Sequence, residues 1–128
     1  MFRKMFANTL YIQVRKNAFR VRHVEGRKER ELAARHPFTT TRLLVGQFRE
    51  AAALLGEGVG AMGSRGLVRP VVVLHPMDMV EGGLSEVEER LLVELAKSIG
   101  ARKVLLHLGP VLTDPQVLSL IEGKGDLA

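Results

Sequence analysis

The sequence predicts an α/β fold: a mixed five-stranded sheet with helices on both faces, in the order βββαβαβα. Three observations predict it. Apolar and polar residues alternate over much of the first third of the chain. A continuously apolar run follows at 70–74, a second largely apolar run lies at 103–108, and a capping box opens an amphipathic segment between these runs. These patterns indicate an antiparallel meander of three strands that is extended by two parallel strands.

The three antiparallel strands are predicted in the first third of the chain. Residues 9–14 (TLYIQV) are rich in β-branched and aromatic side chains, and residues 18–24 (AFRVRHV) alternate apolar residues with Arg20 and Arg22. This alternation places the two arginines on one face of the sheet and the apolar residues on the other. Residues 28–35 are expected to return as the third strand, although their composition also suits a helix.

The middle of the chain predicts a helix, a loop and a buried strand. Threonines at 39–41 offer an N-cap, and apolar residues then recur at helical spacing until Gly56. The glycine-rich stretch 56–66 is expected to form a loop. The run 70–74 (PVVVL) is typical of a strand that is buried on both faces.

The last third predicts two more helices around a second buried strand at 103–108. Residues 85–88 (SEVE) form a capping box, the apolar stripe of the helix includes Val87, and Gly100 closes the helix in the left-handed conformation. Asp114 is predicted to cap the last helix, which turns Val117, Leu118 and Ile121 inward.

The composition is that of one soluble domain over residues 1–128, with a flexible tail at 124–128. The chain is 46% hydrophobic and has no cysteine, which excludes disulfides and thiolate zinc sites. Its apolar runs are too short to span a bilayer, and residues 1–6 lack the apolar core of a secretion signal. We therefore expect a cytoplasmic location.

The positive charge is concentrated at the start of the chain. Residues 1–36 hold ten Lys or Arg and three Glu, a net of +7, whereas residues 37–128 have a net of −2. Such a surface suits phosphate, lipid headgroups or an acidic partner, although it is also typical of a solvated face. The residues of this predicted basic surface are Arg20, Arg22, Arg27, Lys28 and Arg30.

Four segments resemble the first half of a bacterial actin, the rod-shape-determining MreB family. Residues 5–14 (MFANTLYIQV) are similar to its first strand, and residues 69–76 (RPVVVLHP) to its R-P-x-V-V strand. Residues 85–90 (SEVEER) and 100–110 (GARKVLLHLGP) resemble T-E-V-E-x-R and G-A-R-x-V-x-L-I-E-E-P. The resemblance implies a ribonuclease-H-like, actin-like ATPase half-domain.

The departures from this family fall on its ATPase chemistry. Its D-x-G-T phosphate loop corresponds to Gln13, Val14, Arg15 and Lys16, which lack both the carboxylate and the glycine that hold magnesium and phosphate. The acids of the E-E-P motif correspond to Leu108 and Gly109. We therefore expect no ATP hydrolysis and no cofactor, with Gln13, Arg15 and Lys16 as degenerate phosphate-loop positions and residual nucleotide binding as an alternative.

A second candidate site lies at the predicted carboxyl ends of the two parallel strands. His75 and His107 follow these strands and are expected to be neighbours, with Asp78 and Glu81 nearby in the sequence. An acid/base or metal site is one interpretation, and hydrogen-bonded histidines at strand ends are the other. We expect no bound metal.

The expected function is a non-catalytic, protein-interacting module. A lone half-domain exposes a face that a second half would cover, which predicts a homo-oligomer or a partner protein. The resemblance links this module to cell shape or envelope organisation at the inner membrane surface. Nucleic-acid binding by the basic first third is the alternative, but base-stacking aromatics are scarce. The predicted membrane contact comprises Met1, Phe2, Arg3, Lys4, Met5 and Phe6.

Overall fold

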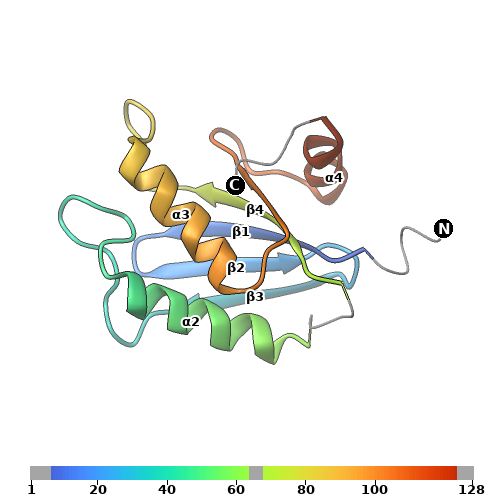
Figure 1. Cartoon of the computed structure of the whole chain (residues 1–128), viewed down its shortest axis with the longest axis horizontal. Helices are drawn as coiled ribbons and strands as arrows, with labels where there is room; N and C mark the ends of the chain where they lie inside the picture. Colours follow the sequence, from blue (N-terminus) through green and yellow to red (C-terminus); the bar gives the residue numbers. More distant parts are fainter. Residues whose placement is uncertain (1–6, 64–67, 124–128) are drawn as a thin grey trace.

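The structure is a computed structural model that describes residues 7–63 and 68–123 (Figure 1). Its strands form one five-stranded sheet in the order β3-β2-β1-β4-β5. The elements are β1 (Thr9–Arg15), β2 (Ala18–His23), β3 (Lys28–Ala33), α2 (Phe48–Ala61), β4 (Val71–Pro76), α3 (Glu86–Ser98), β5 (Lys103–Leu106) and α4 (Asp114–Gly123). The predicted order of strands and helices is confirmed.

The sheet is mixed, as predicted. β1 pairs with β2 and β2 with β3 in antiparallel fashion, whereas β1–β4 and β4–β5 are parallel. Residues 28–33 form the third strand and not a helix. Gln13 near the end of β1 lies opposite Arg20 on β2 and opposite His75 on β4. This register brings the β1–β2 hairpin beside the carboxyl end of β4.

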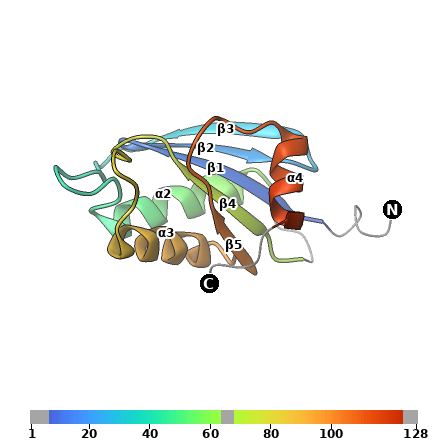
Figure 2. The ribbon, with the colours of Figure 1, turned by 90° about the horizontal axis from the view of Figure 1, so that it is seen from above.

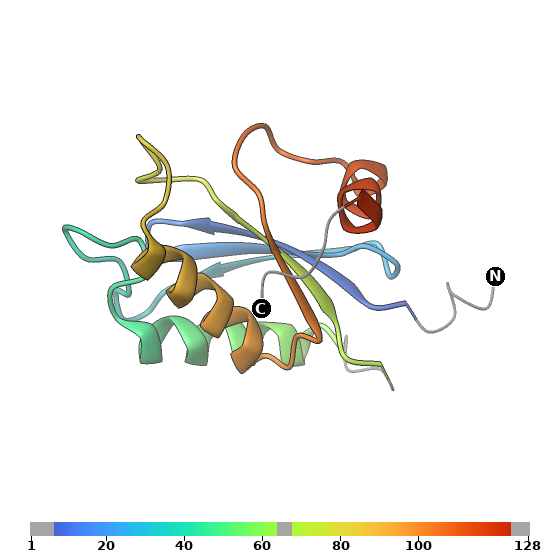
Figure 3. The ribbon, with the colours of Figure 1, turned by 45° about the horizontal axis from the view of Figure 1, so that its top comes forward.

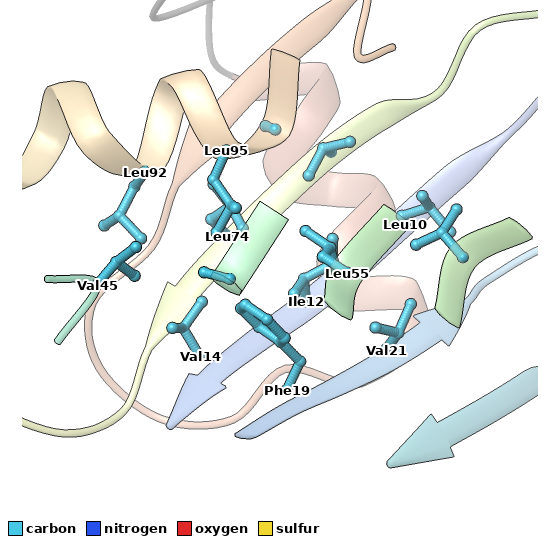
Figure 4. Packing of buried hydrophobic residues seen from close by; sticks show 14 of the residues in the cluster. Leu10, Ile12, Val14, Phe19, Val21, Val45, Leu55, Leu74, Leu92 and Leu95 are labelled. Atoms are coloured by element: carbon cyan, nitrogen blue, oxygen red, sulfur yellow. The ribbon is translucent and has the colours of Figure 1, made fainter. Parts of the chain in front are cut away.

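Helices cover both faces of the sheet. α2 and α3 lie on one face and α4 on the other (Figure 2). Alternate residues of β1, β4 and β5 therefore enter two different cores, which explains why the β4 segment is continuously apolar. The larger core, under α2 and α3, includes Leu10, Ile12, Phe19, Leu55, Leu74 and Leu95 (Figure 4). The smaller core, under α4, includes Tyr11, Val73, Leu105 and Val117.

The first helix begins and ends later than predicted. α2 starts at Phe48, not at the threonines of 39–41, and continues through Gly56 to Ala61. Most of the predicted loop 56–66 is thus helical, and residues 64–67 lie outside the described part of the chain. Tertiary packing overrides the weak helical propensity of these glycines.

The segment before α2 is bound to the β1–β2 hairpin, which explains the late start of the helix. Asn17 Oδ1 accepts hydrogen bonds from the backbone N–H groups of Phe38 and Thr39, at 2.9 and 2.8 Å. The Thr39 hydroxyl donates to the carbonyl of Leu44 at 2.7 Å, so it closes the loop instead of capping a helix. Phe38 is buried against the sheet, and the chain must pass around it before a helix can form.

Gly58 allows α2 to approach β3 closely. A Cβ atom at this position would collide with the end of the Leu32 side chain, whereas a Cβ at Gly56 would meet no atom within 4 Å. We expect Gly58→Ala to lower the free energy of unfolding by about 1–3 kcal/mol through overpacking. Gly56→Ala, the matched control in the same helix, should raise it by about 0.5–1 kcal/mol. Urea unfolding of both variants tests this, and equal effects would contradict it.

The capping box of α3 is confirmed. Ser85 Oγ accepts the backbone N–H of Glu88 at 3.2 Å, and Glu88 Oε1 accepts the backbone N–H of Ser85 at 2.9 Å. Gly100 has a φ of +87°, the left-handed conformation predicted for it. Val87, by contrast, was expected in the apolar stripe but is exposed, because Leu92, Leu95 and Ala96 supply the buried face of the helix.

The last helix is also shifted relative to its prediction. Thr113 and Gln116 form its cap: Thr113 N donates to Gln116 Oε1 at 2.9 Å, and Gln116 N donates to Thr113 Oγ1 at 3.4 Å. The cap thus precedes Asp114, the predicted capping residue. Val117 is buried, but Leu118 is exposed, which corrects its predicted inward position. The helix packs on the sheet through Val117, Leu120 and Ile121.

Candidate functional site

His75, near the carboxyl end of β4, meets His107, the first residue after β5. Their ring centroids are 4.6 Å apart and the rings are inclined by 73°, an edge-to-face arrangement. His75 is 1% exposed, whereas His107 is only partly buried. The parallel pairing of β4 with β5 continues one residue past β5, since His107 N donates to the carbonyl of Leu74 at 2.9 Å. This pairing holds the two rings together.

Tyr11 belongs to the same cluster. Because a carbonyl oxygen can only accept, His75 Nε2 carries the proton in its 2.9 Å hydrogen bond to the carbonyl of Gly109. In the neutral ring, Nδ1 is then the acceptor, and the Tyr11 hydroxyl donates to it at 2.6 Å. The Tyr11 oxygen in turn accepts the backbone N–H of Leu112 at 3.1 Å. The result is a continuous hydrogen-bonded chain.

Tyr11 is not among the predicted site residues, although one feature of the sequence pointed to it. It is the only tyrosine of the chain and lies in the predicted first strand, residues 9–14. A buried tyrosine hydroxyl normally finds a hydrogen-bond partner. His75, a buried polar side chain near the end of the neighbouring parallel strand β4, is that partner.

The loop between β5 and α4 is fastened to this cluster. It leaves β5 and rises on the α4 side of the sheet (Figure 3). His75 donates to Gly109 O, the Tyr11 hydroxyl accepts Leu112 N, and His107 Nε2 donates to the carbonyl of Pro110 at 2.9 Å. Gly109 has a φ of +125°, which only glycine adopts readily. We call residues 107–112 the histidine loop.

The environment of His75 favours its neutral form. Burial is the largest cause that lowers its pKa below the usual 6.5, and the neighbouring charges of His107 and Arg15 lower it further. The hydrogen bond to Gly109 acts in the opposite direction. The ring therefore works near neutral pH as a hydrogen-bond bridge between Tyr11 and the histidine loop, and not as a cation.

Asp78 and Glu81 do not join the histidines. Asp78 Oδ2 accepts the backbone N–H of Lys16 at 2.8 Å, beside the β1–β2 hairpin. Both carboxylates line a separate polar groove of about 550 Å³, together with Lys16, Thr39–Thr41, Met77, Met79 and Val80. Within residues 7–63 and 68–123, no group of three or more His, Asp or Glu side chains is placed to hold a metal ion.

The degenerate phosphate-loop positions are occupied by internal hydrogen bonds. Gln13 is buried, and its Oε1 accepts from the Arg15 guanidinium at 3.0 Å. The backbone N–H of Lys16 is bound to Asp78, and that of Asn17 donates to the Thr39 hydroxyl at 2.9 Å. The N–H of Lys16, a predicted degenerate phosphate-loop position, is thus already paired with a side chain, as is that of the adjacent Asn17.

The predicted basic surface is neutralised at its centre. Arg20 and Arg22 lie on one face of β2, as predicted, where Arg20 contacts Glu29 at 2.6 Å and Glu31 at 3.1 Å. Hydrogen bonding to Arg20 lowers the pKa of Glu29. Arg22 reaches Glu29 at 3.3 Å and also binds Asp114 on α4 at 3.3 Å.

The other members of the predicted basic surface are spread over the β2–β3 turn and β3. Lys28 Nζ donates to the carbonyl of Met62 at 3.3 Å, and Arg27 occupies the turn with a φ of +51°. In the β2–β3 register, Arg30 lies opposite Val21, out of phase with the arginines of β2. The five residues therefore do not form one continuous cationic face.

Most of the large exposed apolar side chains come from one segment of the chain, the histidine loop and α4. Among the described residues, the large ones are Leu108 (44% exposed), Val111 (48%) and Leu118 (39%), with Val87 (61%) on α3. Three of these four come from the single segment 108–118, on the α4 side of the sheet. We call Leu108, Val111 and Leu118 the apolar surface.

The predicted membrane contact, residues 1–6, lies outside the described residues. None of the helices within residues 7–63 and 68–123 has the length and hydropathy that crossing a membrane requires.

The chain is thus an α/β protein with a mixed five-stranded sheet and a Tyr–His–His cluster at the carboxyl edge of that sheet. It is 33% identical over 128 residues to the uncharacterized protein YjaA of Escherichia coli (strain K12), and the match covers 91% of this chain and 99% of that protein. The chain therefore belongs to the same family as YjaA. No protein-family model and no solved structure matches it.

Proposed function

We propose that the chain is a non-catalytic, actin-like half-domain that acts as a protein-interaction module. The strand order β3-β2-β1-β4-β5, with two helices on one face and one on the other, supports the proposal because it is the order that the MreB resemblance implies. The proposed link to cell shape or envelope organisation, and to a cytoplasmic site at the inner membrane surface, follows from the same resemblance.

The apolar surface carries the interaction part of this proposal. Leu108, Val111 and Leu118 are large, exposed and close in sequence, whereas single exposed apolar residues elsewhere need no explanation. The proposed occupant is a second copy of this chain, because one patch can pair with itself across a two-fold axis. A different protein partner is the alternative occupant.

Sedimentation velocity of the full chain over a concentration series tests self-association. We expect a concentration-dependent dimer that is weakened about tenfold or more, or ~1.4 kcal/mol, by Val111→Asp or Leu108→Asp, because each places a charge in the contact. Val87→Asp, on the opposite side of the sheet, is the matched control and should leave the dimer unchanged. A chain that stays monomeric, or variants that dimerise like the wild type, would refute self-association.

The paired hairpin amides support the non-catalytic part of the proposal. A nucleotide present at about 100 times its Kd would stabilise the fold by ~2.7 kcal/mol and raise the Tm by several degrees. We expect no saturable shift with ATP or ADP and magnesium, because Asp78 and Thr39 already occupy the hairpin N–H groups. The thermal shift of the Asp78→Ala variant, in which the Lys16 N–H is free, is compared with that of the wild type under the same conditions. A magnesium-dependent shift of the wild type would overturn the proposal.

The nucleic-acid alternative gains no support from the charge arrangement. Phosphate-tracking surfaces need cations that are free to meet the backbone, but Arg20 and Arg22 are engaged by Glu29, Glu31 and Asp114. We therefore retain the protein-interaction module as the proposed function.

A further inference from the structure

The histidine loop carries two residues of the apolar surface, and hydrogen bonds to the side chains of Tyr11, His75 and His107 hold it in place. Leu108 and Val111 lie on the loop, and Gly109, Pro110 and Leu112 supply the backbone atoms that bind His75, His107 and Tyr11. We infer that His75 is a pH-sensitive latch: its neutral ring fastens the histidine loop, and its protonation releases the loop and weakens self-association. The last step rests on the proposed function, whereas the latch itself does not.

The hydrogen-bonded chain has no place for a second proton on His75. The neutral ring donates through Nε2 to Gly109 O and accepts through Nδ1 from the Tyr11 hydroxyl. A proton added to Nδ1 makes the ring a donor on both sides. The Tyr11 oxygen then accepts from both His75 and Leu112 N, and its own hydroxyl proton loses its acceptor. A buried donor without an acceptor is costly, so the cluster must rearrange.

The charged groups around His75 also disfavour a positive charge on its ring. β1 brings Arg15 toward His75, the end of β5 brings His107, and Tyr11 carries no charge at neutral pH. Arg22 from β2 lies 5.5 Å from the centre of the Tyr11 ring, but Glu29 and Asp114 on β3 and α4 balance its charge. The charges that act directly on His75 in the described part of the chain are therefore both basic. A protonated ring is left without a counter-ion.

The pH range follows from the direction of the pKa shift. In the unfolded chain His75 titrates near its usual pKa of 6.5, and in the folded chain its pKa is lower. Between these two values the unfolded state binds one more proton than the folded state, so stability falls as the pH falls. The latch is fully closed above pH ~6.5 and opens as the pH falls toward the lowered folded pKa.

Nuclear magnetic resonance of the ¹⁵N-labelled full chain from pH ~7.5 to ~4.5 tests the latch directly. We expect the amide signals of Gly109 and Leu112 to move together with the His75 ring signals, and the Leu112 amide to lose protection from hydrogen exchange. A Leu112 amide that stays protected while His75 titrates would refute the latch. So would global unfolding that precedes any titration of His75.

Two variants and a control sharpen this test. His107→Gln removes the neighbouring charge and should move the His75 transition to higher pH with the loop still fastened at neutral pH. Tyr11→Phe keeps the ring but removes the hydroxyl, so the Leu112 amide should exchange rapidly at every pH. His36→Gln changes an exposed histidine outside the cluster and should leave the transition unchanged. The latch would be contradicted if His107→Gln left the pH of the His75 transition unchanged, or if Tyr11→Phe left the exchange of the Leu112 amide unchanged.

Sedimentation at pH ~7.5 and ~5 separates the latch from the proposed function. If the latch and self-association are both correct, the dimer weakens about tenfold or more at the lower pH. If the amides respond but the chain is monomeric at both values, self-association fails and the latch stands. If the dimer is present at both values with equal strength while the amides respond, control of self-association by the latch is refuted.

Discussion

Replacing Phe19 by Ala is expected to lower the free energy of unfolding by roughly 3–5 kcal/mol. Phe19 is fully buried in the core under α2 and α3, and its ring stacks on that of Phe38 with centroids 4.9 Å apart. The substitution removes this contact and leaves a cavity where β2 meets the loop before α2. Because the β1–β2 hairpin also binds that loop through Asn17, the cavity cannot collapse easily.

Urea unfolding followed by circular dichroism measures this effect. Val87→Ala is the control, since it also shortens an apolar side chain but at an exposed position, and we expect it to change stability by less than about 0.5 kcal/mol. A Phe19→Ala protein within about 1 kcal/mol of the wild type would show that the described core packing is wrong.

Arg22→Ala is expected to lower the free energy of unfolding by roughly 1.5–3 kcal/mol, the usual contribution of hydrogen bonds to a charged group. Its guanidinium donates to the carbonyl of Leu112 at 3.0 Å, contacts Asp114 and Glu29, and covers the Tyr11 ring. These contacts join β2 to the end of the histidine loop and the start of α4. Their loss should therefore loosen α4 before the rest of the fold.

Arg20→Ala is the matched control for this prediction. Arg20 lies on the same face of the same strand, but its side chain is 40% exposed. Among the acidic residues that the structure describes, it contacts only Glu29 and Glu31, both on the neighbouring strand β3. Exposed ion pairs contribute little to stability, so the effect should be clearly smaller. Hydrogen exchange of the α4 amides distinguishes the two arginines, and equal effects would contradict the bridging role of Arg22.

Local patterns predicted the strands and the capping box well. The alternation around Arg20 and Arg22, the apolar run of β4 and the Ser85–Glu88 box each depend on neighbours within a few residues, and each is confirmed. The start of α2 could not be predicted in this way, because it depends on hydrogen bonds between Asn17 and residues 38–39, far away in the sequence.

The orientation of single side chains was harder to predict than the elements themselves. Val87 and Leu118 fit the apolar stripes of their helices but are exposed, because each helix touches the sheet over a narrower strip than its apolar residues cover. The pairing of His75 with His107 was predictable because parallel strands end at the same edge. The role of Tyr11 was not predicted, because Tyr11 lies opposite Val73 in the β1–β4 register and its hydroxyl reaches His75 two residues further along β4.

The sequence alone determined the order of strands and helices, the mixed sheet and the meeting of the two histidines, because periodicity and caps act over a few residues. Only the tertiary structure decided what the polar groups do. It paired Arg20 and Arg22 with acids, bound Asp78 to the hairpin, and fastened the histidine loop to Tyr11 and His75. Except for the acids of β3 that bind Arg20 and Arg22, these partners are far apart in the chain. No local pattern specifies the packing that brings them within hydrogen-bonding distance.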